Sequence, residues 1–164
     1  MSLKEFAPAY RAEQERTSSI IGSVFGSARC DEDVAAVIEL VRRWAAVRDD
    51  VHGLALVGSW ARGEASEGSD VDLVLLVDQP DAYLNDDTWI GELGASALRT
   101  KSWGVLTERR LVLPSGLEID LGIAAASWAT APVDAGTRRV VTDGIRVVLD
   151  PYGLLANLLA AITK

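Results

Sequence analysis

The chain has 164 residues, which suits one domain with a substantial core and leaves little room for a second domain. Its formal net charge of −8 argues against a general nucleic-acid-binding surface, which would be basic. One cysteine, Cys30, and one histidine, His52, exclude an internal disulfide and a Cys/His zinc site. The sequence contains neither a secretion-signal pattern nor an apolar run of about 18 residues, so we expect a cytoplasmic protein outside the membrane.

The N-terminal third contains one strong helical pattern. Residues 1–30 form an N-terminal extension of uncertain structure, in which 18–27 have the spacing of a short helix. From Asp31, which can cap a helix, apolar residues recur at helical spacing. These residues are Val34, Val37, Ile38, Val41, Trp44 and Ala45. We therefore place a single domain at 31–164, with a core of about 33–123 that carries the motifs described below.

Two short apolar runs follow, at 53–58 and 71–77, and each is typical of a strand covered on both faces. Between them, 61–66 is predicted as a short helix or turn. Residues 81–98 have the pattern of a broken helix. Its expected inward-facing side chains are Trp89, Ile90, Leu93 and Leu98.

The second half of the chain continues the sheet. Strands are predicted at 103–113 and 117–124, joined by Pro114-Ser115-Gly116 as a hairpin. A helical turn around 134–141, a strand at 145–149 and a helix at 152–162 make up the C-terminal part, 134–164. The predicted fold class is α/β (α+β), with a mixed β-sheet flanked by helices.

Acidic residues stand at the start of one strand and inside another. Because side chains alternate along a strand, Asp70 and Asp72 share one face, and Asp120 lies between apolar neighbours. Taken alone, each acid fits a solvated strand edge or a device against edge aggregation. Together they would repel one another unless a cation intervened. Oxygen ligands without Cys or His favour Mg²⁺ or Mn²⁺ over zinc.

Gly58-Ser59 ends the first strand and opens a turn. A glycine there allows close backbone approach to a phosphate, and Ser59 adds a hydroxyl donor, although an ordinary strand-to-helix turn fits as well. Arg62 is placed either to reach a triphosphate or to pair with Glu64 or Glu67.

Two further sets of side chains leave alternatives open. Arg109 and Arg110 alternate on a strand, so at most one of them can line the acidic side. Trp60, Trp103 and Trp128 fit core packing better than stacking on a base or a ring-shaped acceptor.

Val57-Gly58-Ser59, then Asp70-x-Asp72 and a later Asp120, resemble the nucleotidyltransferase superfamily with a polymerase-beta type of active site. This resemblance implies a nucleotidyltransferase-like fold and a site that uses two Mg²⁺ or Mn²⁺ ions. It implies that Gly58 and Ser59 hold the terminal phosphates, with Arg62 and Ser69 in the nucleotide-binding set. Asp70, Asp72 and Asp120 would be the catalytic metal ligands, and Asp120 would help to deprotonate the acceptor hydroxyl.

The resemblance implies transfer of a nucleoside monophosphate from an NTP, with ATP expected, to a hydroxyl group, releasing pyrophosphate. A small molecule, as in aminoglycoside modification, and a protein, as in toxin modification by an antitoxin, are both open as acceptors. Nucleic acid is disfavoured by the net charge. A second subunit or partner protein is an open route to acceptor selection. The alternative is a non-catalytic nucleotide-binding or antitoxin-type partner-binding module. A structural calcium site is disfavoured because few oxygen ligands cluster in sequence.

Overall fold

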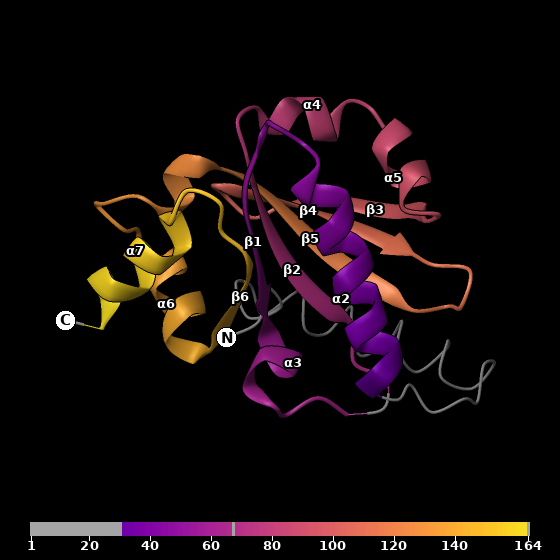
Figure 1. Ribbon diagram of the computed structural model, residues 1–164, viewed down its shortest axis with the longest axis horizontal. Coiled ribbons are helices and arrows are strands. Elements are labelled where there is room, and N and C mark those ends of the chain that lie inside the picture. Colours follow the sequence, from indigo (N-terminus) through magenta and orange to yellow (C-terminus); the bar gives the residue numbers. More distant parts are fainter. Residues whose placement is uncertain (1–30, 67, 164) are drawn as a thin grey trace.

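The computed structural model describes residues 31–66 and 68–163, which form one mixed sheet with helices on both faces (Figure 1). The strands are β1 (Val51–Val57), β2 (Val71–Val77), β3 (Ser96–Ser102), β4 (Leu106–Val112), β5 (Glu118–Ala125) and β6 (Ile145–Leu149). Their order in the sheet is β3-β4-β5-β2-β1-β6. β2 and β5 are parallel, and the other neighbours are antiparallel. The predicted fold class is confirmed.

Helices precede, separate and follow the strands, except that β3, β4 and β5 are consecutive along the chain. The helices are α2 (Asp31–Ala46), α3 (Gly58–Arg62), α4 (Pro80–Leu84), α5 (Thr88–Glu92), the 3-10 helix η2 (Ala126–Ala129), α6 (Ala135–Asp143) and α7 (Leu154–Ile162). The apolar stripe predicted for the first helix is confirmed, since Val34, Val37, Val41 and Ala45 of α2 are buried. Among the described helices, none has both the length and the apolar character that crossing a bilayer requires.

Alternation along the strands divides the core into two clusters. On one face, Leu54, Leu73 and Leu121 belong to a cluster with side chains of α2, α4 and α5. On the other face, Ala55 and Val74 belong to a second cluster with side chains of η2, α6 and α7. Figure 1 shows α2, α4 and α5 on one side of the sheet and α6 and α7 on the other. We call the face toward α6 and α7 the acid face, because it also carries Asp70, Asp72 and Asp120.

One predicted element is wrong. Residues 96–98 are the start of strand β3, not the end of a helix, and Leu98 is 51% exposed instead of facing inward. β3 lies at the edge of the sheet and has no apolar face, since none of its side chains is buried. Hydrophobic periodicity therefore could not reveal it. Within the same stretch, Trp89, Ile90 and Leu93 are buried as predicted.

The predicted hairpin is confirmed: β4 and β5 pair antiparallel, and Gly116 has φ +84° in the turn. His52, predicted to precede the first strand, lies inside β1 and pairs with Asp78. α3 begins at Gly58, a few residues before the predicted start. Cys30 and the predicted helix at 18–27 lie outside the described residues.

Candidate active site

The three predicted catalytic acids lie at one end of the sheet, where β1 passes into α3. Asp72 of β2 is in register with Val57, the last residue of β1, on one side and with Asp120 of β5 on the other. Gly58 and Ser59 follow Val57 directly and begin α3. Sheet pairing alone therefore places the Gly-Ser turn beside the carboxylates, as the motif predicts.

All three carboxylate residues are buried. Asp70 is 7% exposed, Asp72 1% and Asp120 0%. Because Asp72 and Asp120 are directly paired on neighbouring parallel strands, their side chains leave the same face one strand spacing apart, about 4.8 Å. Carboxylates withdrawn from water at this spacing need positive charge beside them.

Arg110 of β4 supplies positive charge at this place. It is in register with Asp120, and its side chain is only 4% exposed. Its Nε donates to Asp120 Oδ1 at 2.7 Å, and its Nη2 donates to Asp120 Oδ2 at 3.0 Å and to Asp70 Oδ2 at 2.6 Å. One guanidinium group thus bridges two of the three predicted metal ligands.

The charged cluster continues across the sheet. Arg110 Nη1 lies 3.5 Å from Glu118 Oε2, and Glu118 is 5% exposed. Further toward the edge, Arg99 of β3 donates to Glu108 of β4 at 3.3 Å. Glu118 thus lies on the same face as Asp120. Alternation allows at most one of the paired arginines to line this face. The structure identifies that arginine as Arg110, while Arg109 points into the opposite core.

The Gly-Ser turn combines a buried glycine with a left-handed backbone conformation. Gly58 is buried and adopts φ +74°, a conformation that favours glycine, and α3 closes at Gly63 with φ +72°. Ser59 is half-buried. Gly58 adopts a backbone conformation that residues with a side chain rarely take.

The remaining predicted nucleotide-binding residues make local contacts. Arg62 Nε pairs with Glu64 at 2.9 Å, which is one of the two arrangements expected from the sequence. The hydroxyl of Ser69 accepts a hydrogen bond from the backbone N–H of Ser66 at 2.9 Å and so shapes the loop that leads into Asp70.

The donor set fits a hard divalent cation in its chemistry, because it consists of carboxylate oxygens that already surround a positive group. Within residues 31–66 and 68–163, however, no three acidic, histidine or cysteine side chains are placed to hold a metal ion as they stand. The position between Asp70 and Asp120 is taken by Arg110.

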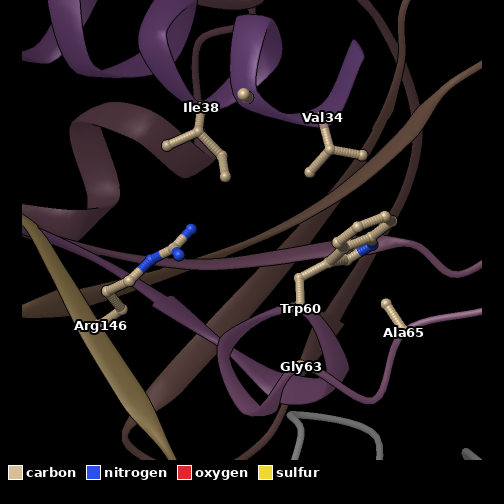
Figure 2. Close-up of a pocket in the computed structure, with 7 residues that line it drawn as sticks. Val34, Ile38, Trp60, Gly63, Ala65 and Arg146 are labelled. Carbon is tan, nitrogen blue, oxygen red and sulfur yellow. The ribbon is translucent and has the colours of Figure 1, made fainter. Parts of the chain in front are cut away.

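A separate pocket of about 450 Å³ lies on the opposite side of the sheet from the acids. It is lined by Val34, Ala35, Ile38, Trp60, Gly63, Ala65 and Arg146. Figure 2 shows Trp60 and Arg146 projecting into it beneath Ile38 and Val34 of α2. Trp60 thus faces away from the carboxylates, whereas Trp128 is buried, as core packing predicts.

Comparison with known proteins agrees with this geometry. The family model of the nucleotidyltransferase domain matches residues 38–124, more than half of the chain, and its span contains every site residue predicted above. The chain belongs to the nucleotidyltransferase domain family. Membership of this family, which the resemblance of Gly58-Ser59, Asp70-x-Asp72 and Asp120 predicts, is therefore confirmed.

This nucleotidyltransferase domain also resembles solved structures at low identity. The Cid1 poly(U) polymerase bound to Mg and 3′-dATP is 21% identical with a TM-score of 0.45, over 67% of this chain and 37% of that one. An aminoglycoside 6-adenyltransferase from Bacillus subtilis is 14% identical with a TM-score of 0.44, over 62% of this chain and 37% of that one. The chain spans a little over a third of each. No curated protein sequence matches it.

Proposed function

We propose that this domain transfers a nucleoside monophosphate from an NTP, with ATP as the expected donor, to a hydroxyl group of a small molecule or protein. The observation that supports this most is the register of Val57, Asp72 and Asp120, which puts the Gly-Ser turn and the buried acids side by side. That arrangement serves a reaction at phosphorus that needs both phosphate binding and charge neutralisation.

In this reaction the acceptor oxygen attacks the α-phosphorus, the bond from that phosphorus to the bridging oxygen breaks, and pyrophosphate leaves. The backbone N–H groups after Gly58 and the hydroxyl of Ser59 would hold the terminal phosphates, with Arg62 and Ser69 nearby. Asp70, Asp72 and Asp120 would hold two Mg²⁺ or Mn²⁺ ions, which neutralise the entering and leaving oxygens. The carboxylate of Asp120 would take the proton of the acceptor hydroxyl.

The proposed acceptor class follows from charge. A chain with net charge −8 lacks the excess of lysine and arginine that would grip a phosphate backbone. A small molecule or a protein side chain is therefore the better acceptor, and a second subunit or a partner protein would help to select it.

A second candidate is a non-catalytic module that binds a nucleotide or a partner protein. The contacts of Arg110 favour it, because an arginine that permanently occupied the carboxylates would take the place of metal. The two candidates differ in whether the acids are required for chemistry.

The test is label transfer. The protein is incubated with Mg²⁺, each α-³²P-labelled NTP in turn and soluble cell extract, and the products are separated into protein and small-molecule fractions. Asp72→Asn is the inactive variant. Asp78→Asn is the matched control, because Asp78 follows the far end of the same strand and is 55% exposed.

We expect label to appear with the wild type and Asp78→Asn and to disappear with Asp72→Asn. Equal labelling by Asp72→Asn would remove the acids from the reaction. Metal-dependent NTP binding without any label would support the binding module. Absence of NTP binding would refute nucleotide transfer and a nucleotide-binding module, and would leave only a module that binds a partner protein.

A further inference from the structure

We propose that Arg110 is a positioning residue that holds Asp70 and Asp120 as their cation in the metal-free protein and is exchanged for divalent metal when nucleotide binds. This inference rests on the proposed function, because it concerns the same carboxylates. It assigns a role to a residue that lies outside the Gly-Ser and Asp-x-Asp motif.

The contacts show how completely the guanidinium engages the acids. Its Nε and Nη2 occupy both oxygens of Asp120, at 2.7 and 3.0 Å, and Nη2 also reaches Asp70 at 2.6 Å. Such two-pronged pairing fixes the orientation of both carboxylates as well as balancing their charge.

Burial makes this cation necessary. Asp120 is 0% exposed and the side chain of Arg110 is 4% exposed, so water cannot screen the carboxylates from one another. Without a positive group, closely placed buried carboxylates would oppose folding of the metal-free chain. Arg110 supplies that group from the neighbouring strand, at the position in register with Asp120.

The same burial prevents arginine and metal from holding these oxygens together. A divalent ion on Asp70 and Asp120 would stand a few ångströms from the guanidinium in a water-poor place, where like charges repel strongly. Metal binding is therefore an exchange of one cation for another. Glu118, whose Oε2 lies 3.5 Å from Arg110 Nη1, provides a carboxylate that the guanidinium can keep after it leaves the aspartates.

The first experiment measures Mn²⁺ affinity in the presence of a non-hydrolysable ATP analogue, from the electron paramagnetic resonance signal of free Mn²⁺. It compares the wild-type chain of 164 residues with Arg110→Gln, Arg110→Lys and Arg109→Gln. We expect Arg110→Gln to bind Mn²⁺ about tenfold more tightly, because the competing cation is gone, whereas Arg109→Gln keeps the wild-type affinity. Arg110→Lys keeps the positive charge but cannot donate two parallel hydrogen bonds to one carboxylate, so its Mn²⁺ affinity should lie between those of the wild type and Arg110→Gln.

Thermal unfolding of the same proteins gives a readout that does not depend on activity. Without metal, Arg110→Gln should melt at least about 5 °C below the wild type, because the buried acids lose their cation. Mn²⁺ with the ATP analogue should raise its melting temperature by more than that of the wild type.

A third measurement uses only the wild type and so remains informative if Arg110→Gln fails to fold. The ¹⁵N–¹H signal of Arg110 Nε, assigned by its absence from Arg110→Lys, should shift when Mg²⁺ and the ATP analogue are added together. An unchanged Nε signal in the saturated wild type would overturn the exchange.

The outcomes separate this inference from the proposed function. Equal or weaker Mn²⁺ binding by Arg110→Gln, with normal binding by the wild type, would overturn the exchange and leave the proposed function intact. Metal binding by Arg110→Gln alone would show that Arg110 blocks the site without giving way to metal, which would overturn the exchange and favour the binding module for the native chain. Absence of metal binding in every protein would refute both.

Discussion

Two neighbouring arginines of β4, Arg109 and Arg110, enter opposite faces of the sheet and do different work. Arg109 Nη1 donates to the backbone carbonyls of Tyr83 and Leu84, each at 3.2 Å, and Nη2 pairs with Asp87, whose side chain is 63% exposed. Arg110 bonds only carboxylates in the contacts described above, and those carboxylates are buried. Both arginine side chains are 4% exposed, so burial alone does not distinguish them.

The acceptors explain the difference. Backbone carbonyls carry no net charge and cannot move independently of the chain. The hydrogen bonds of Arg109 therefore hold β4 against α4 and the segment that leads into α5. Carboxylates carry charge and can change partners, so Arg110 acts as a counter-ion. Arg109 therefore joins structural elements, whereas the role proposed for Arg110 rests on its buried carboxylate partners.

The largest expected difference between the faces is in catalysis. Asp120→Asn should lower kcat for nucleotide transfer at least about 1000-fold, equivalent to ~4 kcal/mol of transition-state stabilisation. Asp87→Asn, the same change on the partner of Arg109, should leave kcat within about threefold, less than ~1 kcal/mol. Steady-state kinetics with the identified acceptor checks both. A comparable loss from Asp87→Asn would mean that the two faces are not functionally separate.

Loss of the Arg109 contacts should have the next largest effect, on stability. Arg109→Met should reduce the free energy of unfolding by about 2 kcal/mol, because two carbonyls lose their charged donor while the apolar core accepts methionine. Urea denaturation measures this.

Arg43→Met is the control for Arg109→Met. Arg43 is 75% exposed and pairs with Glu39 on the surface of α2, so its removal should cost less than about 0.5 kcal/mol. Equal effects of the two substitutions would contradict the fastening role of Arg109.

The sequence predicts the fold where hydrophobic patterns are strong. The stripe of α2, the apolar runs of β1 and β2 and the Pro-Ser-Gly hairpin are each confirmed. The sequence does not reveal β3, because this strand is mostly polar and its one large apolar side chain, Leu98, is exposed. β3 is an edge strand, and its geometry comes from pairing with β4 and not from its own pattern. Tertiary pairing is not encoded in local periodicity.

Sequence patterns also predict part of the candidate site. Alternation along single strands placed Asp70 and Asp72 together and separated Arg109 from Arg110. It could not tell which arginine meets the acids, because that depends on the register of β4 against β5. The positive charge that the acids require was predicted as metal, and in the described structure Arg110 provides it.

A smaller effect tests how tightly the acid face is packed next to Asp120. A Cβ added at Gly122 would lie 2.8 Å from both Cδ atoms of Leu106, which is itself buried. Gly122→Ala should therefore reduce the free energy of unfolding by about 1–2 kcal/mol, since Leu106 must shift within a packed layer.

Gly91→Ala provides the comparison on the other face. Gly91 lies in α5, and apart from its chain neighbours and its own helix backbone, no atom of the described residues lies within 4 Å of the Cβ it would gain. The substitution should be neutral or add up to about 1 kcal/mol of stability, because alanine favours a helix. Urea unfolding of both variants decides the point, and a neutral Gly122→Ala would show that Leu106 has room to move.

The smallest effect concerns Tyr83, on the Arg109 side. Burial raises the pKa of Tyr83 to about 12, and its hydrogen bond to Asp50 Oδ2 at 2.6 Å adds to this, although Arg48 lowers the pKa. The folded pKa thus exceeds the unfolded value of about 10. The stability that this shift contributes is present below pH 10 and is lost as the pH rises toward 12.

Absorbance of tyrosinate during a pH titration should show one of the chain's three tyrosines ionising late, and Tyr83→Phe should remove that step. Persistence of the late step in Tyr83→Phe would assign it to another tyrosine. On this face Arg48, which also contacts Asp50 and Glu92, lowers the pKa of Tyr83, but burial and the Asp50 hydrogen bond outweigh it. On the acid face, every partner of Arg110 among its described contacts is a buried carboxylate, and two of the three are the predicted site residues Asp70 and Asp120.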